Sequence, residues 1–259
     1  MQRIPLRRLI LGAYVVGVLL FLIVPVLIVI PMSFSDARFI TFPPPDFSLR
    51  WYDAFFSSSE WLKATQTSLT VAVLATLIAT PLGVAAAYAV ENTHHWSMRY
   101  VRVILMLPLM IPLIIVAAGL FLAFAKTGLW ASITGLVLAN VMLSLPFVVT
   151  SVGAGLQGFD KSQEMVARSL GMNRLRAFFA VVLPQIKPSV ISGAIFAFIW
   201  SLDETIVALF ISGGSNQTLT KVMFTRLRDE IDPTIAAIST MLIVGTLTLT
   251  AFAALLRRR

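Results

Sequence analysis

The sequence predicts an all-helical membrane protein with six transmembrane helices in a single transmembrane domain and both termini on the cytoplasmic side. Hydrophobic residues make up 58% of the 259 residues and charged residues only 12%, whereas soluble proteins contain about 25% charged residues. Apolar stretches of about 20 residues, the length that crosses the hydrocarbon as a helix, recur along the chain. These expected spans are residues 9–31, 67–90, 103–125, 129–152, 189–211 and 235–256.

The first span differs from a signal peptide, although arginines precede it. Its apolar core is longer than the roughly 7–15 residues of a signal peptide, and no small-residue cleavage site follows. We therefore expect it to remain as a transmembrane helix. Residues 32–64, which follow it, are polar and aromatic and contain the run Pro43-Pro44-Pro45. This composition predicts an extended segment followed by a short amphipathic helix near the membrane interface.

Prolines interrupt the second and third spans. In the second span, Pro81 and Gly83 are the expected kink points. In the third, Pro108 and Pro112 each remove a backbone donor about one turn apart. A broken helix at membrane depth is tolerated mainly where it faces protein or a cavity, so the third span is expected to do so.

The distribution of lysine and arginine sets the predicted orientation. With the N-terminus inside, the inner segments carry 13 basic residues and the outer segments carry 7. The inner residues include Arg3 before the first span and Arg257–Arg259 after the last. Acidic residues show the opposite distribution, 3 inside against 7 outside, so the net charge of +8 reflects topology and does not require a nucleic-acid partner.

Residues 160–188, the longest polar-punctuated segment between spans, have the features of a docking surface. They predict two short helices joined at Gly171, because glycine adopts the left-handed conformation at a helix C-terminus without a Cβ penalty. Asp160 is expected to cap the first helix, with Gln163 at the reciprocal position.

The first of these short helices has an apolar side and a charged rim. A docking partner explains this pattern, and so does an ordinary amphipathic loop between two spans. The residues concerned are the apolar Met165, Val166 and Leu170 and the charged Lys161, Glu164 and Arg168.

Asp203 and Glu204 are ionisable residues inside an otherwise apolar span, which is where functional residues of membrane proteins concentrate. At 1.5 Å per residue, Asp203 lies about 21 Å along the helix from Ser189, in the outer half of the bilayer. No basic residue of the chain is expected at this depth, so the acids face a wet cavity, a partner subunit or a cationic substrate, or else they snorkel or cap helix contacts. Adjacent positions point about 100° apart, so at most one acid faces the same lumen as Trp200.

Residue types that the sequence lacks exclude several functions. The absence of cysteine excludes disulfides, thiolate metal sites and a cysteine nucleophile. The sequence has no GxxxxGK[ST], HExxH or GxSxG motif, so the chain is not itself an ATP hydrolase. An intramembrane hydrolase is a distant alternative, disfavoured because the two intramembrane acids are neighbours on one helix. A channel is a second distant alternative, and it would not explain the docking segment.

Four residues of the docking segment have a characteristic spacing, namely Gly171, Val181, Leu183 and Pro184. This spacing resembles the cytoplasmic EAA loop of permease subunits of ABC importers, in which Glu-Ala-Ala is followed by three residues, Gly, nine residues, Ile, one residue and Leu-Pro. Val181 stands in place of the isoleucine. In that family the loop forms a coupling helix that sits in a cleft of the ATP-hydrolysing subunit.

The beginning of the segment departs from the family pattern. Met165 and Val166 stand where glutamate and the first alanine are expected, Ala167 matches the second alanine, and Glu164 lies one position early. The resemblance implies that the residues docking the ATPase subunit are Glu164, Met165, Val166, Ala167, Leu170 and Gly171.

Nearly the whole chain, from FSLRWYDAFF through SLDETIV to DPTIAAIST, resembles the permease subunits of spermidine/putrescine ABC importers. This resemblance implies the type I ABC importer permease fold, a bacterial inner-membrane location and a non-catalytic subunit without a cofactor or metal of its own. ATP would be bound by the partner ATPase. The residues implied for the translocation pathway are Asp203, Glu204, Trp200, Pro108 and Pro112.

The same resemblance implies the partners. They are a second, homologous permease subunit, two ATPase subunits and an extracytoplasmic substrate-binding protein. Related permeases carry ferric iron, phosphonates or other organic solutes, so these solutes remain the alternatives to a polyamine.

Overall fold

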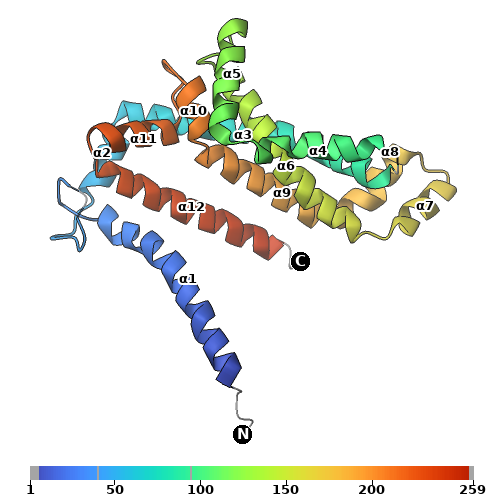
Figure 1. The fold of residues 1–259 in the computed structure, drawn as a ribbon, viewed down its shortest axis with the longest axis horizontal. Coiled ribbons are helices and arrows are strands. Elements are labelled where there is room, and N and C mark those ends of the chain that lie inside the picture. The colour runs from blue at the N-terminus through green and yellow to red at the C-terminus, as the bar shows by residue number, and fades with distance from the viewer. Residues whose placement is uncertain (1–5, 40, 94, 257–259) are drawn as a thin grey trace. The chain divides into compact units, whose positions relative to one another are not determined.

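A computed structural model describes residues 6–39, 41–93 and 95–256 of the chain, which form helices and the connections between them (Figure 1). Within these ranges no β-sheet forms, and the only strand-like pairings are two isolated bridges. The expected all-helical class is therefore confirmed. Arg3 and Arg257–Arg259, which contribute to the predicted orientation, lie outside the described residues.

Most of the helices follow one another closely, and the longest connection lies between α1 and α2. In chain order they are α1 (Leu6–Ser33), α2 (Arg50–Ser57), α3 (Ser59–Asn92), α4 (Ser97–Met110), α5 (Leu113–Thr127), α6 (Ile133–Gln157), α7 (Lys161–Ser169), α8 (Arg174–Ala177), the π-helical turn η1 (Phe178–Val182), α9 (Leu183–Asp203), α10 (Ile206–Ile211), α11 (Leu219–Asp229) and α12 (Thr234–Leu256). Five helical segments of the described chain are long and apolar enough to cross a membrane, and the number is six if the bent pair of α4 and α5 is counted as one broken span. The six predicted spans correspond to these segments.

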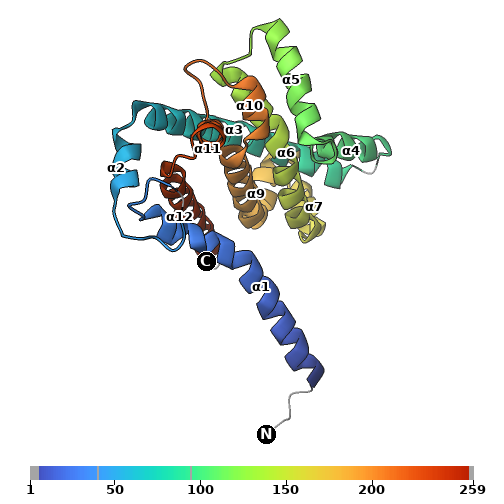
Figure 2. The same cartoon turned by 60° about the vertical axis from the view of Figure 1, so that its left-hand side comes forward.

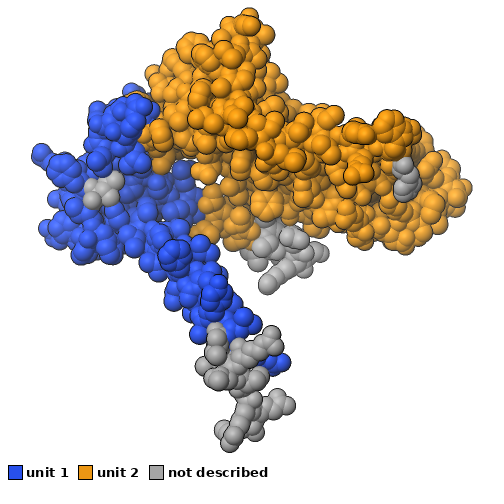
Figure 3. All heavy atoms as spheres, in the orientation of Figure 1, with its two compact units in different colours: residues 1–59, 225–245 blue, residues 60–224, 246–259 orange. Residues whose placement is uncertain are grey.

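The chain divides into two compact units, residues 1–59 with 225–245 and residues 60–224 with 246–259 (Figure 3). In the first unit, the predicted short amphipathic helix is present as α2. The segment before it is not extended as predicted, because Ser35 pairs with Phe47 and the chain turns back on itself. The Ser33 hydroxyl and the Tyr52 hydroxyl lie 2.8 Å apart and join α2 to the end of α1. The second unit contains the docking segment and the acidic pair.

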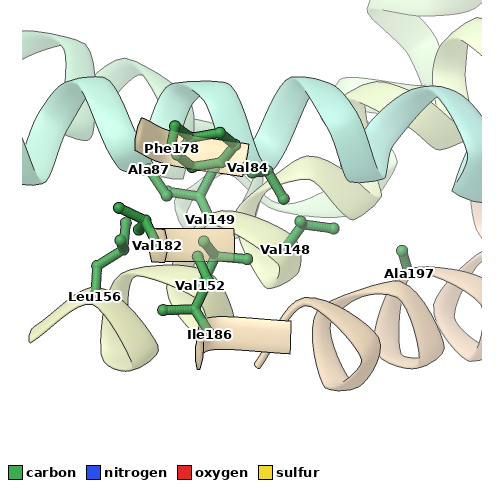
Figure 4. Packing of buried hydrophobic residues seen from close by; sticks show 10 residues of the cluster. All are labelled: Val84, Ala87, Val148, Val149, Val152, Leu156, Phe178, Val182, Ile186 and Ala197. Atoms are coloured by element: carbon green, nitrogen blue, oxygen red, sulfur yellow. The ribbon is translucent and has the colours of Figure 1, made fainter. Parts of the chain in front are cut away.

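The core of the second unit forms where α3, α6, η1 and α9 meet. Figure 4 shows buried side chains from all four elements, including Val84 of α3, Val148 of α6 and Ile186 of α9. A Cβ on Gly83 would lie 2.5 Å from Cγ1 of Val148, so this glycine permits close approach of α3 and α6. Helix α3 continues without a break through Pro81 and Gly83, so the second span is not interrupted at these residues.

The third span is broken rather than straight, and the break lies at Pro112. Ile111 has the extended conformation (φ −90°, ψ 135°), which is favoured before a proline because the ring disfavours a helical preceding residue. Helices α4 and α5 consequently meet at an angle of 100° (Figure 2). Pro108, by contrast, lies inside α4 without ending it.

The fifth span is also broken, which the sequence did not predict. Helix α9 ends at Asp203, Glu204 is extended (φ −66°, ψ 114°), and α10 begins at Ile206. A single helix over residues 189–211 is therefore wrong. The uninterrupted hydropathy of the sequence conceals the break, which the Glu204 side chain stabilises as described below.

Two further elements differ from expectation. The second short helix continues through η1 directly into α9, because Pro184 lies in the first turn of α9, where a proline nitrogen needs no hydrogen bond. Pro188 lies inside α9.

Helix α11 occupies a stretch that hydropathy alone marks as a loop. The backbone N–H of Leu219 in this helix donates to Ser68 Oγ at 2.8 Å.

Candidate docking surface and translocation pocket

Residues at the two ends of α7 determine where this helix begins and ends. Asp160 caps it, accepting from the Ser162 backbone N–H at 3.0 Å and from the Ser162 hydroxyl at 2.8 Å. These hydrogen bonds hold the pKa of Asp160 below its usual range. Gly171 ends the segment with φ +94°, as predicted. Gln163 does not complete a reciprocal cap, because its side-chain oxygen accepts instead from Gln185 at 2.6 Å.

The outer side of α7 and its C-cap residue Leu170 expose three large apolar side chains. Met165 is 60% exposed, Val166 is 58% exposed and Leu170 is 80% exposed. Exposed apolar side chains clustered on one short helix and bordered by charges indicate an interaction surface. We call these three residues the docking face.

The inner side of α7 holds Glu164 and Ala167, which are buried at 8% and 6% exposure. The Tyr88 hydroxyl of α3 donates to the Glu164 carboxylate at 2.5 Å, and the Arg174 guanidinium lies 5.2 Å from the centroid of the Tyr88 ring. Residues three apart on a helix share a face, so Glu164 and Ala167 point inward together while their neighbours point outward. Glu164 therefore orients the helix and does not form part of its exposed face.

A second acid connects the start of α7 to the ends of three other helices. The Glu91 carboxylate of α3 pairs with Arg102 of α4 and accepts from Gln157 of α6 at 3.2 Å. The Lys161 ammonium of α7 donates to the Glu91 backbone carbonyl at 2.8 Å. The sequence analysis assigned no role to Tyr88 or Glu91. Their polar side chains near the end of a span could have indicated one.

The acidic pair has two different environments. Glu204 is buried, and its carboxylate accepts from the backbone N–H groups of Val207 at 2.6 Å and Ala208 at 2.9 Å. It thereby caps α10, because the first amides of a helix have no partner within the helix. Asp203 is exposed, and its carboxylate has no ion-pair partner within the described part of the chain.

A pocket of about 230 Å³ adjoins Asp203. Its lining combines Trp200 and Asp203 from the end of α9 with Leu113, the residue directly after Pro112. The Trp200 ring packs against Phe147 with centroids 4.7 Å apart. Trp200 Nε1 is buried, and no described residue accepts a hydrogen bond from it. The structure thus places the two broken spans, the acids and Trp200 around one cavity, whereas Pro108 does not line it.

Metal chemistry gains no support from the side chains. Among the described residues, no three histidine, aspartate or glutamate side chains lie close enough to hold a metal ion. Besides Asp203, the pocket is lined by Trp200, by the apolar Leu113 and Ile206, and by Glu204 and Thr205. Such a pocket can hold an organic cation by charge and ring contacts.

Comparison with known proteins gives one family and several relatives. Residues 79–259 match the family described as "Binding-protein-dependent transport system inner membrane component". The spermidine/putrescine transport system permease protein PotC of Escherichia coli (strain K12) is 29% identical over 252 residues, which cover 97% of this chain and 95% of PotC. The putrescine transport system permease protein PotI of the same strain is 32% identical over 241 residues, covering 90% of this chain and 85% of PotI.

The solved structures include a similar fold. A chain of a bacterial ABC transporter involved in the import of the acidic polysaccharide alginate superposes with a TM-score of 0.77 at 16% sequence identity. The match covers 98% of both chains. The helical arrangement of an ABC importer permease is therefore confirmed for nearly the whole chain.

Proposed function

Because the chain belongs to the family of binding-protein-dependent transport system inner membrane components, we propose that it forms half of the pathway through which an ATP-driven importer moves polyamines. It is a multi-pass, non-catalytic membrane subunit of an ABC importer. The proposal adds the identity of the solute, which is a polyamine. Two relatives named for spermidine or putrescine transport, each aligned over at least 90% of this chain, support it.

The observation that carries the solute proposal is the exposed Asp203 carboxylate beside Trp200. A polyamine is a chain of ammonium groups separated by methylenes, and it needs a compensating charge in a low-dielectric passage. At an effective dielectric constant of 20, opposite charges 4 Å apart attract by about 4 kcal/mol, against about 1 kcal/mol in water. The indole face adds a cation–π contact. The Glu204 carboxylate already accepts two backbone amides, so Asp203 is the acid that faces the solute.

We also propose that the docking face packs into a cleft of an ATPase subunit. Its three apolar side chains would be covered there, while Glu164 and Tyr88 hold α7 against α3. The proposed complex contains a second, homologous permease subunit, two ATPase subunits that bind the ATP, and an extracytoplasmic binding protein. Both termini of this chain would then lie on the cytoplasmic side of the bacterial inner membrane, as would α7.

The substitution Asp203→Asn tests the solute proposal. It keeps the shape of the side chain and removes its charge, so uptake of labelled spermidine or putrescine by intact cells should fall about tenfold or more, a factor equivalent to about 1.4 kcal/mol. Asp229→Asn, at an exposed position on α11, is the matched control and should leave uptake unchanged. Normal polyamine uptake by Asp203→Asn at parental membrane levels would refute the role of this acid.

A further inference from the structure

An apolar groove of about 510 Å³ opens on the second unit, away from the Asp203 pocket. Its walls are Val84 and Tyr88 of α3, Phe178 and Phe179 of η1, and Leu183 of α9. Phe178 forms the back wall and packs edge-on against Tyr88 with ring centroids 4.8 Å apart. Figure 4 shows the same ring beside Val84. Packed aromatic rings therefore form the back wall of the groove.

The π-helical turn η1 forms part of the groove wall. Such turns are rare and are found mostly at functional sites. Here the turn places Phe178 in the core and leaves the adjacent Phe179 62% exposed at the edge of the groove.

One end of the groove carries a positive charge. The Arg174 guanidinium lies over the Tyr88 ring, and its described hydrogen bond is one long contact of 3.5 Å from Nε to the Tyr88 hydroxyl. Arginine has five N–H donors, so most of this exposed group is available to a ligand. Its planar donors match the geometry of phosphate and of carboxylate groups.

The position of Arg174 along the spans fits a membrane interface. Arg174 begins the apolar segment Arg174–Asp203, and Tyr88 lies four residues before the end of α3. Thr80 lines the other end of the groove, eight residues before Tyr88, which corresponds to about 12 Å along the helix. In a bilayer that this span crosses, such a groove would run from the headgroup level into the hydrocarbon.

We propose that this groove binds one anionic phospholipid, with an acyl chain between α3 and α9 and the phosphate at Arg174. The lining is apolar along its length and cationic at one end, which matches the two parts of such a lipid. A polyamine does not fit, because Arg174 repels cations. The bound lipid would link α3 to the segment that carries α7.

Native mass spectrometry of the assembled transporter tests the proposal. The complex is purified in mild detergent and supplied with phosphatidylglycerol or phosphatidylcholine. The parental complex should retain phosphatidylglycerol in preference to phosphatidylcholine. Ala85→Trp fills the groove from an exposed position of α3 and should abolish retention. Arg174→Gln should lower the preference for phosphatidylglycerol by about tenfold, as expected for the loss of one charge-assisted contact.

Two matched variants serve as controls. Ala89→Trp makes the same change at an exposed position of α3 outside the groove, and Arg176→Gln removes an exposed charge from α8 outside the groove. Both should retain phosphatidylglycerol as the parental complex does. Equal retention by Ala85→Trp and the parent, or no preference between the two lipids in the parent, would overturn the proposal. Loss of the partner permease from Ala85→Trp, with lipid still bound, would instead assign the groove to a protein contact.

Discussion

Glu164 and Tyr88 show how one buried pair fixes the direction of a docking helix. The carboxylate is buried on the inner side of α7 and accepts the Tyr88 hydroxyl at 2.5 Å. The next two residues, Met165 and Val166, therefore face outward. A glutamate at the position of Met165, where the EAA pattern has it, would instead lie on the exposed face.

Tyr88→Phe removes the hydroxyl and leaves the Glu164 carboxylate without that donor. Leaving a buried acceptor unsatisfied costs about 1–3 kcal/mol, so α7 should separate more easily from α3. Limited proteolysis of the detergent-solubilised chain should then cut within residues 160–175 faster than in the parent. Tyr100→Phe, at an exposed tyrosine of α4, is the control. Equal cleavage rates in all three chains would show that the hydrogen bond does not hold the helix.

At the residue scale, the sequence predicted which types of residue matter better than it predicted their orientation. Asp203, Glu204 and Gly171 were identified from charge and backbone chemistry. Glu204 caps α10, Gly171 follows the end of α7 with positive φ, and Asp203 lines the pocket. Glu204 caps α10 and Asp203 stays exposed because the helix breaks at this point, and hydropathy does not reveal that break. The inward orientation of Glu164 depends on Tyr88, 76 residues away, and local patterns contain no such contact.

The elements that matter most are interrupted helices. Pro112 breaks the third span and Glu204 breaks the fifth, and both breaks border the pocket that contains Asp203. Broken backbone leaves unpaired polar groups, which membranes tolerate only beside protein or water. The Glu204 carboxylate satisfies two of these groups at the start of α10. The break at Pro112 could be predicted because the proline itself lacks the backbone N–H donor. The break at Glu204 could not be predicted, because no residue there lacks a donor.

Val166→Asp tests the docking face at the scale of the helix. A carboxylate at this exposed site should leave α7 folded but place a charge in an apolar contact, so recovery of the ATPase subunit with the purified permease should fall about tenfold or more. Ser169→Asp adds the same charge at an exposed polar position of α7 and should preserve recovery. If Val166→Asp and Ser169→Asp recover the ATPase equally, the three apolar residues do not dock it.

At the scale of the whole molecule, hydropathy predicted the order of the apolar spans, and their predicted number agrees with the described helices when α4 and α5 are counted as one span. About 20 apolar residues are needed wherever a helix crosses a membrane. The packing of α3, α6 and α9 could not be derived from hydropathy. These contacts depend on small residues such as Gly83, whose importance appears only when the facing side chain, Val148, is known. Helix α11 was missed because its apolar residues are few and spaced along one face.

Cysteine labelling tests the predicted orientation. The chain contains no cysteine, so single substitutions have no background in this subunit. Ser57→Cys and Ser215→Cys, both at exposed positions, should react with an impermeant thiol reagent in intact spheroplasts, and Ser169→Cys on α7 should react only after lysis. Labelling of Ser169→Cys in intact spheroplasts would place α7 outside and exclude docking to a cytoplasmic ATPase.

Coupled transport in proteoliposomes tests the central claim most directly. The permease pair and ATPase subunits are reconstituted with ATP inside, the binding protein and labelled spermidine are added outside, and uptake and ATP hydrolysis are measured together. Spermidine-loaded binding protein should stimulate hydrolysis and drive spermidine uptake, and vesicles lacking this chain should show neither. Ferric iron and phosphonate, supplied with their own binding proteins, should not replace spermidine. Spermidine uptake no greater than in vesicles lacking this chain would contradict the assignment as a polyamine permease.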